Sequence, residues 1–145
     1  VDEINEQAWK NFVQKVTQNC APLKGKTLGI LGLSFKPNTD DMREAPSIKI
    51  IESLQKKGVK IRAYDPEAQK NASQILKNVI YCKNPYEVAK GAEALLIITE
   101  WNEFRQLDLL KIKNLMRKPV IFDGRNVYDP AKIKALGFDY YGVGR

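Results

Sequence analysis

An apolar run, Thr27–Leu33, leads into a polar loop, Leu33–Ser47, and then into a segment with helical spacing, and this order most constrains the fold. The run is typical of a buried strand. The helical segment, Ser47–Lys57, ends at Gly58, a typical C-cap. In an open α/β sheet, ligands bind in the crevice at the carboxyl ends of the strands. The loop Leu33–Ser47 is therefore the first place to look for a binding site.

Strands and helices continue to alternate to the end of the chain. This alternation predicts an α/β fold: a Rossmann-like, doubly wound, mostly parallel sheet of about six strands, preceded by an N-terminal helix. We expect that first helix to run from Val1 to about Cys20. The expected strands are Thr27–Leu33, Val59–Tyr64, Val79–Tyr81, Ala94–Thr99, Pro119–Phe122 and Asp139–Val143. The expected helices are Ser47–Lys57, Glu67–Leu76, Pro85–Lys90, Asp108–Met116 and Pro130–Leu136, with a short turn or helix at Trp101–Arg105.

The chain has 145 residues, the size of one domain, and its 43% hydrophobic content indicates a globular protein rather than a disordered one. No apolar run is long enough to span a membrane, and we expect no signal peptide. The two cysteines, Cys20 and Cys82, are isolated, which favours a reducing, cytoplasmic setting. There is no histidine and no C-x-x-C pair, so we expect no metal site and no histidine base.

The net charge of +7 has three possible readings: an anionic ligand, nucleic acid, or a solvated surface rich in lysine. The basic residues are scattered, and the longest runs are pairs such as Lys56-Lys57. A nucleic-acid-binding surface gathers its cations into a patch or stripe. We therefore expect no nucleic-acid partner.

Four motifs at consistent spacing carry a resemblance to a known family. They are F-K-P-N-T-D-D-M-R-E-A-P-S at Phe35–Ser47, Y-D-P at Tyr64–Pro66, T-E-W-N-E-F-R at Thr99–Arg105, and F-D-G-R-N-V-Y-D at Phe122–Asp129. Together they resemble the C-terminal, UDP-binding domain of the UDP-glucose/GDP-mannose dehydrogenase family, in the form found in UDP-glucose 6-dehydrogenases. The resemblance covers nearly the whole chain.

This resemblance implies a role in the NAD-dependent oxidation of UDP-glucose to UDP-glucuronate. In the family, an N-terminal domain binds NAD, and the catalytic Cys, Lys, Asn and Asp lie upstream of the part that this chain resembles. We therefore expect no catalytic residue here and no activity from the chain alone. Residues 1–22 are expected to be the C-terminal part of the linker helix between the domains, and residues 23–145 the UDP-sugar-binding domain. The resemblance also implies a homodimer for the full enzyme.

The resemblance further assigns roles to loop residues. Phe35, Lys36, Thr39, Asp40 and Asp41 are expected to line the UDP-sugar site, with Lys36 contacting the substrate.

Two arginines complete the expected site. Arg125 is expected to bind the substrate, and Arg43 is expected to reach the NAD diphosphate held by the other domain. The residues alone leave an alternative open. Lys36 and Arg43 could pair with the acidic residues of their own loop, and Arg125 with Asp123 or Asp129.

A dinucleotide site in the chain's own cleft is disfavoured. That site needs G-x-G-x-x-G after the first strand, and here only Gly32 falls near the right place, with Phe35, Lys36 and Pro37 behind it. Asp65, at the end of the second strand, would suit a ribose hydroxyl, but Asp-Pro is also a common turn.

Four aromatic side chains, Tyr64, Trp101, Phe104 and Tyr128, could stack on a base, although such residues more often fill the core. Glu100 is expected to be solvated or structural.

Two other functions stay open. The full protein could oxidise another nucleotide sugar, such as UDP-N-acetylmannosamine or GDP-mannose, or the chain could be a stand-alone module that binds a nucleotide sugar.

Overall fold

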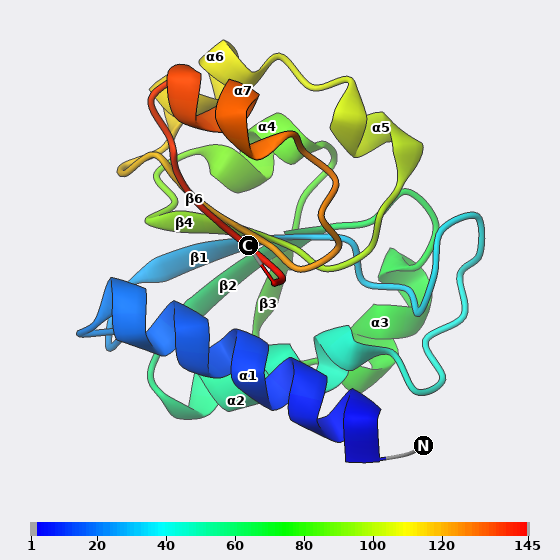
Figure 1. Cartoon of the computed structure of the whole chain (residues 1–145). Helices are drawn as coiled ribbons and strands as arrows, with labels where there is room; N and C mark the ends of the chain where they lie inside the picture. The colour runs from blue at the N-terminus through cyan, green and yellow to red at the C-terminus, as the bar shows by residue number, and fades with distance from the viewer. Residues whose placement is uncertain (1–2, 145) are drawn as a thin grey trace.

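The computed structural model describes residues 3–144, with side chains from residue 6 onward. Its centre is a six-stranded sheet covered by helices on both faces (Figure 1). The strands are β1 (Thr27–Leu31), β2 (Lys60–Tyr64), β3 (Val79–Tyr81), β4 (Ala94–Ile97), β5 (Val120–Asp123) and β6 (Asp139–Gly142). The helices are α1 (Glu3–Cys20), α2 (Pro46–Lys56), α3 (Gln69–Ile75), α4 (Pro85–Ala89), α5 (Asn102–Arg105), α6 (Leu109–Leu115) and α7 (Pro130–Ala135).

The sheet has the order β3-β2-β1-β4-β5-β6, and every pair of neighbouring strands is parallel. The predicted doubly wound sheet is thus confirmed, and it is fully rather than mostly parallel. The order reverses between β1 and β4, so the topological switch point lies at the carboxyl ends of these two strands. The predicted helix start at Val1 and the predicted domain end at residue 145 lie outside the described residues.

Alternating side chains divide the core into two layers. Leu28 and Ile30 of β1 point into the layer under α1, α2 and α3, whereas Leu31 points into the layer under α4 to α7. Leu96 and Leu95 of β4 divide in the same way. Because successive strand residues face opposite sides, a sheet covered on both faces needs strands that are apolar throughout. The buried runs of β4 and β5 meet that need.

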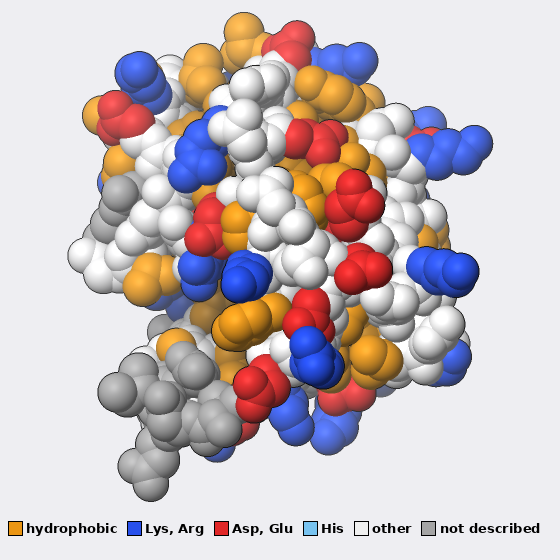
Figure 2. Space-filling model, turned by 90° about the vertical axis from the view of Figure 1, so that its right-hand side faces the viewer, with side chains coloured by type: hydrophobic (Ala, Val, Ile, Leu, Met, Phe, Trp, Pro, Cys, Tyr) orange, Lys and Arg blue, Asp and Glu red, His pale blue; other side chains and the backbone are white. Residues whose placement is uncertain are grey.

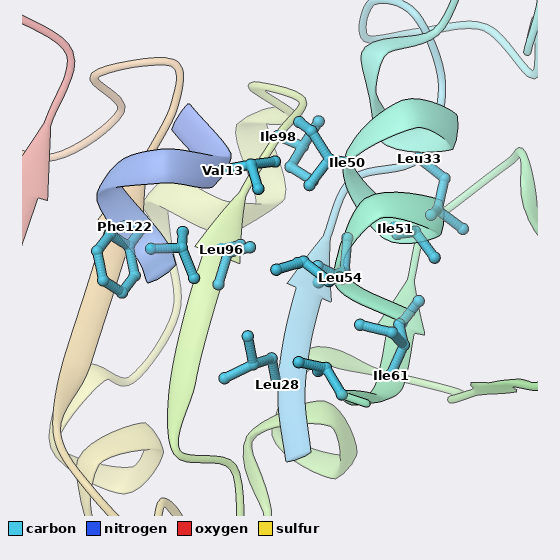
Figure 3. Close-up of a cluster of buried hydrophobic side chains, with 14 of the residues drawn as sticks. Val13, Leu28, Leu33, Ile50, Ile51, Leu54, Ile61, Leu96, Ile98 and Phe122 are labelled. Carbon is cyan, nitrogen blue, oxygen red and sulfur yellow. The ribbon is translucent and has the colours of Figure 1, made fainter. Parts of the chain in front are cut away.

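Helix α1 packs on this domain. Val13 and Val16 are buried, and Figure 3 shows Val13 pointing toward the side chains of the sheet and of α2. Lys15 Nζ donates a hydrogen bond of 2.7 Å to the carbonyl oxygen of Gly142, which ends β6. Each fully buried aliphatic side chain contributes roughly 1.5–3 kcal/mol. Burial of Val13 and Val16 therefore stabilises the packing of α1 on the domain.

Local signals set the element ends. Asn84 accepts a hydrogen bond from the backbone N–H of Glu87 at the start of α4, and Asp108 accepts one from Lys111 N at the start of α6, so both residues cap their helices. Strand β1 ends at Leu31, two residues earlier than expected, because Gly32 has φ +95° and cannot continue a strand. None of the described helices is long and apolar enough to cross a membrane.

Candidate ligand-binding site at the carboxyl ends of the strands

Three loops meet at the carboxyl edge of the sheet: residues 32–45 after β1, residues 98–101 after β4, and residues 124–129 after β5. Figure 2 shows this face of the molecule, where acidic and basic side chains are interspersed with hydrophobic ones. Neighbouring parallel strands bring these loops together, although they are far apart in the sequence. The edge therefore collects the motifs that the sequence analysis singled out.

The loops after β1 and β4 are in direct contact at the switch point. A Cβ on Gly32 would lie 2.6 Å from both the Cβ and the backbone nitrogen of Thr99. Thr99 Oγ1 donates a hydrogen bond of 2.7 Å to the carbonyl oxygen of Ser34. Glycine is required here for two reasons, the positive φ and the close approach. The two loops consequently behave as one packed unit.

Asp65, at the end of β2, is 3% exposed and turns inward. One carboxylate oxygen accepts hydrogen bonds from Leu33 N (2.7 Å), Ser34 N (3.0 Å) and Trp101 Nε1 (3.1 Å). The other accepts from the backbone N–H groups that open the turn before α3. The sequence alternative in which Asp65 binds a ribose hydroxyl is therefore wrong, because its acceptors are occupied within the protein.

The loop after β1, residues 32–45, which we call the signature loop, is held at both ends. Phe35 N donates to the carbonyl of Asp41 (2.9 Å), and Asp41 N donates to Thr39 Oγ1 (3.2 Å). Ser47, in the first turn of α2, donates from Oγ to the carbonyl of Leu33 at 2.6 Å. Met42, inside the loop, is buried in the core. These contacts order a loop that leaves Phe35 44% exposed, which is unusual for a large apolar side chain.

Arg43 forms a two-pronged ion pair within the loop. Its Nε and Nη2 donate to the two carboxylate oxygens of Asp41 at 3.1 and 3.0 Å. These hydrogen bonds hold the pKa of Asp41 below its ordinary value, and the charge of Lys36 acts in the same direction. The Arg43 side chain remains 89% exposed. The loop-ordering pair that the sequence left open is therefore present for Arg43.

A shallow groove of about 720 Å³ runs between the signature loop and α3. It brings together four of the predicted site residues, Thr39, Asp40, Asp41 and Arg43. The other predicted residues, Phe35, Lys36 and Arg125, do not line it. The groove is completed by Met42, Glu44, Ile48, Asn71, Gln74 and Ile75.

Arg125 sits on the loop after β5 and forms an ion pair with a neighbouring strand end. Its Nε and Nη2 donate to the Glu100 carboxylate at 3.1 and 2.8 Å. The expected alternative, a side-chain pair with Asp123 or Asp129, is wrong, although Arg125 N does donate to Asp123 Oδ1. Burial raises the pKa of Glu100, but the hydrogen bonds and charge of Arg125 outweigh it, and the net pKa lies below the ordinary 4.5.

The loop that carries Arg125 is itself fixed by a buried carboxylate. Asp123 is fully buried, and its Oδ2 accepts hydrogen bonds from Tyr128 N (3.0 Å) and the Tyr140 hydroxyl (2.8 Å). The sequence analysis missed this role of Asp123 and the matching role of Asp65. A signal was available: in both Y-D-P and F-D-G an aspartate stands directly after a buried strand, where backbone N–H groups of the next loop need acceptors.

Three of the four aromatic residues that could have stacked on a base belong to the core, and the fourth, Tyr64, is partly buried. Trp101, Phe104 and Tyr128 are buried, so they offer no open face to a base. Tyr64 donates its hydroxyl proton to both Glu103 oxygens, at 2.9 and 3.0 Å. Glu100 has the structural role that was one of its two predicted roles, because it forms an ion pair with Arg125.

Neither cysteine shows the features of a catalytic thiol. Cys20 and Cys82 are both buried, and burial raises the pKa of each thiol, opposite to the shift that activates a nucleophile.

Known proteins resemble this chain at both the sequence and the fold level. A UDP-glucose 6-dehydrogenase of Rhizobium meliloti (strain 1021) is 44% identical over 123 residues, covering 85% of this chain and 28% of that protein. The UDP-glucose 6-dehydrogenase YwqF of Bacillus subtilis is 44% identical over 146 residues, covering 100% of this chain and 33% of that protein. The chain thus spans about a third or less of the length of these relatives.

Among solved structures, a UDP-glucose dehydrogenase from the hyperthermophilic archaeon Pyrobaculum islandicum superposes with a TM-score of 0.82 at 32% identity, covering 97% of this chain and 30% of that one. The family description that matches residues 29–130 reads "UDP-glucose/GDP-mannose dehydrogenase family, UDP binding domain". That match includes the signature loop, Asp65, Glu100 and Arg125. The chain therefore belongs to the UDP-glucose/GDP-mannose dehydrogenase family, with residues 29–130 matching its UDP binding domain.

Proposed function

We propose that this chain binds the UDP part of a UDP-sugar and serves as the substrate-recognition domain of an NAD-dependent UDP-glucose 6-dehydrogenase. The observation that carries the proposal is the family match over residues 29–130, which includes the loops after β1, β4 and β5. The cations at this edge fit the charge of a diphosphate. Lys36 follows β1 and Arg125 follows β5, on either side of the end of β4.

The chemistry of the side chains supports separate roles. A guanidinium offers a planar fork that can bind two phosphate oxygens, and an ammonium is a compact point charge for a third. Arg125 already holds the Glu100 carboxylate in this two-pronged way, and its side chain is 46% exposed. A diphosphate would replace Glu100 as its partner. Lys36 then supplies the second charge.

The remaining predicted residues contact other parts of the ligands. Phe35, Thr39, Asp40 and Asp41 line the nucleotide-sugar site. Arg43 faces the NAD diphosphate that a separate NAD-binding domain holds.

Further proposals concern the rest of the enzyme. Residues 1–22 belong to the helix that links the two domains, and residues 23–145 form the UDP-sugar-binding domain. The redox steps take place in the NAD-binding domain, so this chain mixed with UDP-glucose and NAD produces no NADH. The full enzyme is a cytoplasmic homodimer. The family also includes enzymes for GDP-mannose, and comparing UDP with GDP in the binding experiment distinguishes these nucleotides.

The experiment is a calorimetric titration of the chain with UDP, using matched arginine variants. Arg125→Ala and Arg117→Ala each remove one charge and one arginine–glutamate ion pair, because Arg117 pairs with Glu93 at 3.2 Å. Arg117 precedes β5 and so lies at the opposite edge of the sheet. We expect Arg125→Ala to weaken UDP binding at least tenfold and Arg117→Ala to leave it within twofold of the original.

Lysine variants provide a second matched pair. Lys36→Ala is expected to weaken UDP binding, whereas Lys60→Ala, at the amino end of β2, is expected to have no effect. An equal loss in both members of a pair would mean that only the net charge of +7 matters, and it would refute a site at the carboxyl edge.

A further inference from the structure

The buried carboxylate of Asp65 connects three segments that follow different strands. It accepts hydrogen bonds from Leu33 and Ser34 of the loop after β1, from Trp101 of the loop after β4, and from Glu67 and Ala68 of the turn after β2. Asp65 is 3% exposed, so water does not compete for these bonds. A carboxylate has about four acceptor positions, and here both oxygens are used by internal donors.

The backbone N–H groups of Leu33 and Ser34, in the loop after β1, show how this sheet differs from one that binds a dinucleotide. In a dinucleotide-binding sheet, N–H groups directly after the first strand bind the pyrophosphate of the cofactor. Here the N–H groups of Leu33 and Ser34 point at Asp65 instead, at 2.7 and 3.0 Å. An internal anion therefore occupies the place at which this kind of sheet would accept a phosphate.

We propose that Asp65 is a positioning residue: its carboxylate stands in for a phosphate at the end of β1 and thereby fixes the loops that carry Lys36 and Glu100. This inference rests on the proposed function of the carboxyl edge, and it adds a residue that does not touch the ligand.

The sequence neighbours of the donors explain the effect on binding. Ser34 is two residues before Lys36, and its Oγ donates to the carbonyl of Lys36 at 2.9 Å. Trp101 directly follows Glu100, which holds Arg125. One carboxylate thus sets the position of the backbone next to the lysine and next to the partner of the arginine. Losing it would free the backbone that carries Lys36 and the backbone that carries Glu100, the carboxylate that pairs with Arg125.

The test uses Asp65→Asn, which keeps the size of the side chain but replaces one acceptor oxygen by an NH₂ group that faces N–H donors. Glu67→Gln is the matched control, because it makes the same chemical change two residues away on an exposed side chain. Two quantities are measured in the chain: UDP affinity by calorimetry, and hydrogen exchange of the Leu33 and Ser34 amides, with Leu96 in the centre of β4 as reference.

We expect Asp65→Asn to weaken UDP binding at least tenfold and to speed exchange at Leu33 and Ser34 at least tenfold more than at Leu96. Glu67→Gln is expected to change neither quantity. Equal exchange gains at all three amides would show general destabilisation and overturn the positioning role. Unchanged UDP affinity in Asp65→Asn, with the wild type binding UDP, would overturn it as well.

Failure of the proposed function is distinguishable from failure of this inference. If the wild type does not bind UDP, the proposed function fails, while the exchange at Leu33 and Ser34 still decides whether Asp65 holds the loop. If Asp65→Asn does not fold, Trp101→Phe removes one donor and keeps a buried ring. We then expect a severalfold loss of UDP affinity with the Leu33 and Ser34 amides still protected, and unchanged affinity would refute the link between the loops.

Discussion

Replacing Gly32 by alanine tests whether the contact between the β1 and β4 loops is as tight as the structure has it. Gly32 has φ +95°, and an added Cβ would lie 2.6 Å from both the backbone nitrogen and the Cβ of Thr99. Thr99 is fully buried and is tied to Ser34 by a hydrogen bond of 2.7 Å, so it has no room to retreat. The substitution therefore adds two penalties, one from the backbone conformation and one from overlap.

The size of each penalty follows from the geometry. A left-handed backbone conformation costs an alanine roughly 1–2 kcal/mol. Forcing a methyl group into a packed site costs typically about 1–3 kcal/mol more. Gly32→Ala should therefore destabilise the chain by roughly 2–5 kcal/mol. Gly91→Ala is the matched control, because Gly91 has φ +74° and nothing within 4 Å of the added Cβ. Gly91→Ala should be destabilised only by the backbone conformation, by roughly 1–2 kcal/mol.

The assay is urea unfolding of both variants and the wild type, monitored by far-UV circular dichroism. Free energies of unfolding are compared with the same dependence on urea concentration assumed for all three proteins. The difference between the two variants isolates the overlap with Thr99. If Gly32→Ala is as stable as Gly91→Ala within about 0.5 kcal/mol, which is the usual scatter of surface substitutions, the loops are not packed as described. That result would refute the close contact between Gly32 and Thr99 at the ends of β1 and β4.

Three further predictions use the same assay. Glu100→Gln should lower the free energy of unfolding by about 0.2–1 kcal/mol above pH 4.5, because the ion pair with Arg125 is partly exposed. The pKa of Glu100 in the folded chain is below 4.5, so the difference in stability between Glu100→Gln and the wild type should vanish as the pH falls through that pKa. Asp123→Asn should cost roughly 1–3 kcal/mol by leaving the buried Tyr140 hydroxyl with a poorer acceptor, and a neutral result would contradict that network. Val16→Ala should cost about 2 kcal/mol by removing two buried methyl groups, whereas no change would mean that α1 does not pack on the domain.

Much of the fold could be predicted from the sequence because the decisive signals are local. The apolar runs that became β4 and β5 needed only their own residues to be recognised, and the caps Asn84 and Asp108 act within one helical turn. Boundaries were less accurate where a single backbone angle decides them. Strand β1 stops at Leu31 because Gly32 adopts φ +95°, which no hydrophobicity pattern encodes.

The partners of the charged residues could not be predicted, because they depend on strand order. Asp123 and Asp129 are the nearest carboxylates to Arg125 in the sequence, but both are used by backbone N–H groups, Asp129 as the cap of α7. Glu100 is far away in the chain and becomes the partner because β4 and β5 lie side by side. Asp65 reaches Trp101 across β1 for the same reason.

The sheet has the strand order of a dinucleotide-binding fold, but its loops differ from those that bind a dinucleotide. The connection after β1 is long, because α2 begins only at Pro46. The N–H groups of Leu33 and Ser34 are satisfied by Asp65. These two N–H groups are therefore not available to an anion at this edge, and the proposed site relies on the side chains of Lys36 and Arg125. Two arginines of the predicted site are each held by a carboxylate, Arg43 by Asp41 and Arg125 by Glu100. Under the proposed function, binding would exchange a carboxylate for a phosphate, which would keep the guanidinium charge compensated in both states and make affinity depend on geometry rather than on net charge.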